Sequence, residues 1–97
     1  MATILEDLAF SSWLAGLRDA KGRARINARI ERIRLSEHFG DCESVGGGVS
    51  ELRIHFGPGY RVYFCRRGDE IIILLGGGVK ATQSRDIRAA QSRAQEY

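Results

Sequence analysis

Apolar and polar residues alternate through residues 49–64, and Gly57-Pro58-Gly59 interrupts the alternation once. Because successive side chains of a strand point to opposite faces, the pattern predicts two strands joined by a tight turn, a β-hairpin. One predicted face is apolar and consists of Leu52, Ile54, Phe56, Tyr60, Val62 and Phe64. The opposite face carries Glu51, Arg53, His55, Arg61, Tyr63 and Cys65. We expect the apolar face to be covered and the second face to stay open to water.

Two stretches before the hairpin have the period of an amphipathic helix. In the first, apolar residues recur at i, i+3, i+4 and i+7, namely Phe10, Trp13, Leu14 and Leu17. Residues 19–22 predict a break, and a second helix is predicted over residues 23–35, with an inward row of Ile26, Ile30 and Ile33. Residues 2–5 fit either a short edge strand or the approach to the first helix.

The elements after the second helix are shorter. Residues 42–45 form a predicted strand between glycine-containing loops, and residues 66–69 form a predicted turn. The run 71–75 is apolar at every position, which is typical of an inner strand, and three glycines would then lead out of it. A last helix is predicted from Thr82 or Ser84 toward Tyr97. Its apolar row is thin, so we expect it to pack weakly; the row is Ile87, Ala90 and Ala94.

This order predicts an α+β fold, in which two N-terminal helices and a C-terminal helix pack on one face of a small, mostly antiparallel sheet. The chain is too short for a second hydrophobic core beside the first domain, so we expect one domain over residues 1–97. The N-terminus is acidic, unlike a secretory signal, and the run 71–75 is too short to cross a bilayer. We therefore expect a cytoplasmic protein with no membrane partner.

The charges indicate an acidic partner. The formal net charge is +3, and thirteen of the fifteen basic residues are arginine, whose planar guanidinium can bind phosphate through two hydrogen bonds. The helix predicted over residues 23–35 has one acid, Glu31, against five arginines, which are Arg23, Arg25, Arg29, Arg32 and Arg34. Such a face can be merely solvated, but its one-sided sign favours contact with RNA, DNA or an acidic protein segment.

Other kinds of chemistry find no support in the sequence. Cys42 and Cys65 are too few for a disulfide framework, and His38 with Cys42 lacks the further ligands of a metal site. The glycines before Lys80 lack the spacing of a phosphate-binding loop. We expect neither a metal nor another cofactor.

The polar hairpin face has the residue types that RNA cleavage needs. The reaction removes a proton from the ribose 2′-hydroxyl, stabilises a charged phosphorane and protonates the leaving oxygen. Arg53 and Arg61 could hold the phosphate, and Lys80 could add a further cation. His55 could move a proton near neutral pH, and Tyr63 could stack on a base. For each residue taken alone, an ordinary solvated strand face is the alternative.

Several segments carry a family resemblance: Gly48 to Phe64, Leu75 to Lys80, Gln83, Asp86-Ile87, Trp13-Leu14, Leu17-Arg18-Asp19 and Phe39-Gly40-Asp41. Together they resemble, over nearly the whole chain, the phage-related, HigB-like branch of the RelE/ParE toxin superfamily. The resemblance implies the toxin of a bacterial type II toxin-antitoxin module with a small cognate antitoxin, often of the helix-turn-helix type. Operator DNA would be contacted only through that antitoxin.

The resemblance also implies an activity and a site. HigB- and RelE-like relatives are mRNA endonucleases, or mRNA interferases, that commonly act at the ribosome and thereby inhibit translation. Their basic residues on the central strands and after the last strand match four positions here, which we expect to be catalytic: Arg53, His55, Arg61 and Lys80. We expect a metal-independent endoribonuclease whose further RNA-binding residues are Tyr63, Arg85, Arg29 and Arg32.

A second function stays open at this point. A ParE-like toxin would inhibit DNA gyrase by binding it and would cleave nothing itself. The basic residues of the hairpin would then be dispensable, and the helix surfaces or the C-terminal segment would carry the toxicity.

Overall fold

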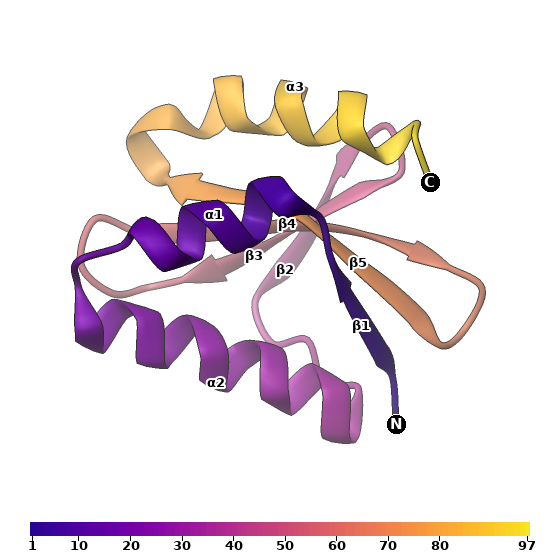
Figure 1. Cartoon of the computed structure of the whole chain (residues 1–97), viewed down its shortest axis with the longest axis horizontal. Helices are drawn as coiled ribbons and strands as arrows, with labels where there is room; N and C mark the ends of the chain where they lie inside the picture. Colours follow the sequence, from indigo (N-terminus) through magenta and orange to yellow (C-terminus); the bar gives the residue numbers. More distant parts are fainter.

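The computed structural model describes all 97 residues and contains a five-stranded sheet with the strand order β1-β5-β4-β3-β2 (Figure 1). The strands are β1 (Thr3–Glu6), β2 (Cys42–Gly46), β3 (Val49–Ile54), β4 (Tyr60–Arg67) and β5 (Ile71–Val79). The helices are α1 (Leu8–Gly16), α2 (Ala20–Ser36), the short 3-10 turn η1 (Lys80–Thr82) and α3 (Gln83–Ala94). The α+β class and the hairpin of β3 and β4 are confirmed, and none of the helices is long and apolar enough to cross a bilayer.

The N-terminal residues form an edge strand, which settles the alternative left by the sequence. β1 pairs in parallel with β5, whereas every other pair of neighbouring strands is antiparallel. A parallel partner must come from a crossover connection, and here the chain passes through two helices and three strands before β5.

α1 and α2 cover one face of the sheet, and their apolar rows form the first core with the apolar face of the hairpin. α2 begins at Ala20, three residues earlier than predicted, because the carboxylate of Asp19 caps it. Asp19 Oδ1 accepts a hydrogen bond from the Gly22 amide at 3.0 Å, and Oδ2 accepts one from the Tyr60 hydroxyl at 2.8 Å. The residues expected to break the helix therefore start it.

α3 covers the second face of the sheet, opposite α2 (Figure 1). The expectation that all helices share one face and leave the other open is therefore wrong. A second core lies beneath α3, and its buried members are Val49, Tyr63, Cys65, Ile73, Leu75, Ala90 and Ala94. Two alanines of α3, Ala90 and Ala94, are buried, and their small side chains bring the helix close to the strands. Both faces of the hairpin are thus at least partly covered.

The glycines of β5 continue the strand to Val79 rather than leading out of it. Their lack of a side chain permits close approach from both faces of the sheet. A Cβ atom at Gly77 would overlap the ring of Trp13 in α1, and one at Gly78 would overlap the carboxylate of Asp86 in α3. The glycine run therefore lets α1 and α3 pack against the same strand.

Candidate functional site

The register of the hairpin places the two central arginines opposite each other. Arg53 of β3 pairs with Arg61 of β4, which in turn pairs with Gly78 of β5. Directly opposed residues of an antiparallel pair project to the same face, with Cβ atoms about 5 Å apart. The structure thus brings Arg53 and Arg61 together, as the alternation predicted.

Glu51 lies between these arginines as a fully buried carboxylate. Its Oε1 accepts a hydrogen bond from Arg53 Nε at 3.1 Å and lies 3.9 Å from Arg61 Nε. Its Oε2 accepts a hydrogen bond from the Gln83 side chain at 2.8 Å. Because Gln83 opens α3, this one carboxylate links two neighbouring strands to the helix that covers them.

Arg61 is nearly buried, with 7 % of its side chain exposed, although the sequence suggested an open face. Its Nη1 donates to the carbonyl oxygens of Gly59 and Tyr60 at 3.2 and 3.3 Å, and its Nε has no hydrogen-bond partner. The guanidinium is therefore held in one orientation by backbone. The unpaired Nε is buried and lies 3.9 Å from Glu51 Oε1, so an anion that reaches the end of the hairpin could meet only the exposed part of the guanidinium.

Lys80 approaches Arg61 at the turn of the hairpin. Its amide donates to the Gly59 carbonyl oxygen at 2.8 Å, and Arg61 donates to the same oxygen. A Cβ built on Gly59 would lie 3.2 Å from Lys80 Cβ and 3.4 Å from Arg61 Nη1. The backbone and Cβ of the exposed Lys80 thus lie beside the guanidinium of Arg61, on either side of the space that Gly59 leaves open.

Tyr63 is fully buried beneath α3, so the expectation that it faces water is wrong. Its hydroxyl has no hydrogen-bond partner. The pKa of Tyr63 is raised well above its ordinary value, first by burial and then by the nearby charge of Glu51. In this conformation Tyr63 packs the second core, and contact with an RNA base would require α3 to move.

Arg53 and His55 meet a cluster of acids at the edge of the sheet. Arg53 forms ion pairs with Glu43, Glu51 and, at 4.0 Å, Asp41. Asp41 Oδ2 also lies 2.5 Å from Nε2 of His55, whose side chain is 71 % exposed. The hydrogen bond from His55 and the charge of Arg53 lower the pKa of Asp41. An ionised Asp41 accepts from Nε2, which leaves Nδ1 of the neutral imidazole as a proton acceptor.

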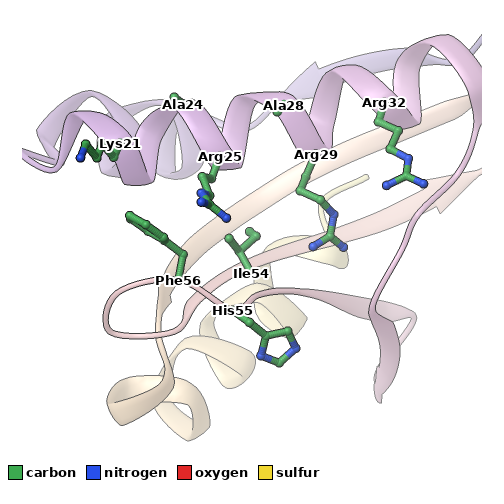
Figure 2. A pocket seen from close by; sticks show the side chains of 9 residues that line it. All are labelled: Lys21, Ala24, Arg25, Ala28, Arg29, Arg32, Ile54, His55 and Phe56. Carbon is green, nitrogen blue, oxygen red and sulfur yellow. The ribbon is translucent and has the colours of Figure 1, made fainter.

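Arg29 and Arg32 lie on α2, at a groove that faces the end of β3 (Figure 2). Arg29 donates to the carbonyl oxygens of Arg53, Phe39 and Asp41 at 2.6, 2.7 and 3.1 Å. Those bonds occupy Nη1 and Nη2 of its guanidinium and fix the loop before β2, so Arg29 has a structural role here. Arg32 is exposed and remains available to a partner.

Arg85 lies in the first turn of α3, exposed and next to Asp86. Its Nη2 is 3.2 Å from Asp86 Oδ1, whereas Asp86 Oδ2 accepts from the Thr82 hydroxyl at 2.6 Å. With Lys80 and Arg88 it borders a shallow basic depression at the start of α3. Arg85 is therefore near Lys80 along the chain, and separate from the groove on α2.

The eight candidate residues do not form one cluster. Arg61 lies with Lys80 at the hairpin turn, and Asp41 joins Arg53 to His55. The two groups are linked through Glu51, which contacts both Arg53 and Arg61. Sequence reasoning missed the acids that organise both groups. Glu51 could have been recognised from the sequence, because it lies two residues before Arg53 and therefore shares its strand face. The contact of Asp41 with His55 spans fourteen residues and has no local sequence pattern.

Comparison with known proteins identifies the family. The family model described as Phage derived protein Gp49-like (DUF891) matches residues 12–95, which is most of the chain. This protein belongs to the Gp49-like family. An uncharacterized protein of Haemophilus influenzae is 48 % identical over 89 residues, which covers 92 % of this chain and 89 % of the relative. The matched region of the Gp49-like family includes α2, the hairpin, β5 and all of α3.

Proposed function

We propose that this Gp49-like protein is the toxin of a bacterial type II toxin-antitoxin module and that it cuts mRNA at the ribosome without a metal ion. The proposal places it in the HigB-like branch of the RelE/ParE superfamily, to which its sequence motifs are similar. The position of Lys80 at the hairpin turn, with its Cβ beside Gly59 and next to the fixed guanidinium of Arg61, carries the proposal. Two cations of this kind are suited to a phosphodiester whose negative charge increases in the transition state.

The proposed reaction is an intramolecular transfer within the RNA. The 2′-oxygen loses its proton and attacks the adjacent phosphorus, the bond from phosphorus to the 5′-oxygen breaks, and that oxygen takes up a proton from water. A 2′,3′-cyclic phosphate and a 5′-hydroxyl result. Lys80 and Arg61 would stabilise the phosphorane, and Nδ1 of His55 would accept the 2′ proton while Asp41 holds the ring through Nε2. Arg53 would be a positioning residue, because it pairs with Asp41, which holds His55.

His55 lies on the α2 side of the hairpin end, so the RNA would have to reach both groups of residues. Because the 2′-hydroxyl and the phosphorus that it attacks belong to one linkage, His55 and the two cations must all reach that linkage, which favours a flexible unpaired nucleotide over a rigid helix. Arg32 and Arg85 would hold the flanking nucleotides on either side.

The test is primer extension on a translated mRNA after induction of the protein. Wild type should yield codon-phased cuts, and Arg61→Ala should abolish them. Arg66→Ala is the matched control because it removes an exposed arginine of β4 that lies at the opposite end of the strand from Arg61 and belongs to neither group. Toxicity without any cuts, or cuts that persist in Arg61→Ala, would contradict the nuclease proposal.

A second candidate function is ParE-like inhibition of DNA gyrase by binding alone. The burial of Tyr63 and the three acids around Arg53 favour it, because they leave fewer free groups for catalysis. Accumulated gyrase-DNA cleavage complexes together with uncut mRNA would establish this function and exclude the first. In either case the proposed neutralising partner is a cognate antitoxin, which would mediate any contact with operator DNA.

A further inference from the structure

α2 and the end of β3 enclose a groove of about 690 Å³ (Figure 2). Its apolar lining is small: Ile54 lies on the strand between the two walls, and the exposed Ala24 and Ala28 lie on the outer edge of α2. Basic residues of α2 form one wall, and His55 and Phe56 form the other. The groove is separate from the convergence of Arg61 and Lys80, because neither residue lines it.

The groove carries positive charge that the chain itself does not neutralise. No acidic residue lines it, and Lys21, Arg25 and Arg32 form no ion pair within 4.0 Å. Arg29 is bound to backbone carbonyls, and its pKa is lowered chiefly by burial, so it is the least available of the cations. Three cations therefore line the groove without a counter-charge.

The spacing of these residues matches a second helix. Lys21, Arg25 and Arg32 follow one side of α2 over about 16 Å, or three helical turns. Ala24 and Ala28 lie four residues apart on the adjoining row, and small side chains in such a row let another helix approach closely. A helix with carboxylates three and four residues apart could meet the cations while its apolar residues rest on the alanines.

A nucleic acid fits the groove less well. Its phosphates would meet the cations, but it has no apolar face for Ile54 and the two alanines. The aromatic ring of the groove, Phe56, is already covered by the guanidinium of Arg25, 4.5 Å from the ring centroid. A base would have to displace that contact to stack there.

We propose that this groove binds an acidic amphipathic helix of a partner protein. Carboxylates of that helix would pair with Lys21, Arg25 and Arg32, and its apolar side chains would cover Ala24 and Ala28. The bound helix would also cover His55 at the rim of the groove. The identity of the partner rests on the proposed function. If that function holds, the partner is the antitoxin, and its helix blocks proton transfer to His55 directly.

The test uses the full chain and a labelled synthetic helix of about 16 residues, long enough to span the groove, with one stripe of glutamates and one of leucines. Fluorescence anisotropy should show binding that weakens as salt is added. Arg25→Glu should weaken binding by about tenfold or more, which corresponds to about 1.4 kcal/mol. Arg88→Glu, the same charge reversal on the exposed face of α3, should leave the affinity within about twofold. Circular dichroism of both variants checks that the fold is kept.

Three results would overturn the inference. Equal losses of affinity in Arg25→Glu and Arg88→Glu would show a general charge effect. Equal affinity for a peptide with glutamine in place of glutamate would remove the role of the carboxylates. Binding of a single-stranded uridine oligonucleotide that depends on Arg25, with no binding of the peptide, would assign the groove to RNA. If the peptide does not bind but wild type still produces codon-phased cuts, only this inference is contradicted. If the peptide binds but no mRNA is cut, only the nuclease function is contradicted.

Discussion

Removal of the Glu51 carboxylate should destabilise the protein far more than removal of the neighbouring Glu43 carboxylate. Both acids form an ion pair with Arg53, but Glu51 is fully buried, whereas the side chain of Glu43 is 59 % exposed. The variants Glu51→Ala and Glu43→Ala therefore each remove one carboxylate partner of Arg53, the first from a buried position and the second from an exposed one. The comparison isolates the effect of burial.

The structure sets the expected magnitudes. Glu51→Ala removes the acceptor of the hydrogen bonds from Arg53 and Gln83 and leaves the nearly buried Arg61 without its nearest counter-charge. Breaking a buried ion pair from one side typically costs about 3–5 kcal/mol. An exposed pair such as the one made by Glu43 contributes about 0–1 kcal/mol. We therefore expect a difference of about 3 kcal/mol between the two variants.

Equilibrium urea unfolding, followed by far-ultraviolet circular dichroism, measures both free energies of unfolding. For a domain of this size, about 3 kcal/mol also corresponds to a fall in Tm of about 12 °C or more. Gln83→Ala should lie between the two, because it removes one hydrogen bond to Glu51 and keeps the charge in place. Losses in Glu51→Ala and Glu43→Ala that agree within about 0.5 kcal/mol would refute the reasoning, since additivity errors are of that size.

Three further outcomes are expected. Gly77→Ala should lower the free energy of unfolding by about 1–3 kcal/mol, because the new methyl group meets the ring of Trp13. Gly16→Ala is the control and should not lower it, because the space around Gly16 is open; urea unfolding measures both. Stability should fall on acidification, since hydrogen bonds lower the folded pKa of Asp19 below its unfolded value of 3.8. Its contribution is complete above 3.8 and is lost as the pH falls through the folded pKa, and thermal melts of Asp19→Asn should show a weaker dependence. Lys80→Ala should reduce mRNA cleavage by about tenfold or more with an unchanged Tm, because the ammonium is exposed; an equal fall in Tm would indicate a structural role.

The candidate site was predictable in its composition and only partly in its arrangement. Strand alternation correctly places Arg53 and Arg61 on one face, because opposed residues of an antiparallel pair share a face. The same alternation placed Tyr63 on the face that was expected to be open to water, although Tyr63 is buried. A period of two distinguishes the faces of a strand, but it does not say which distant segment covers each face.

By itself, the sequence determined the local elements of this protein. The helical period identifies α1 and α2, alternation around a glycine turn identifies the hairpin, and the continuous apolar run identifies the start of β5. Each of these signals is a short-range repeat that one segment carries alone.

Only the tertiary structure decided what those elements bury and which charges meet. Two buried alanines place α3 over the second face, since a helix with small side chains can approach a strand that has glycines. Three features join segments that are ten or more residues apart. They are the hydrogen bonds from Arg29 to three carbonyl oxygens, the contact of His55 with Asp41, and the groove on α2. Such contacts depend on the sum of packing and desolvation over the whole chain, which no local pattern records.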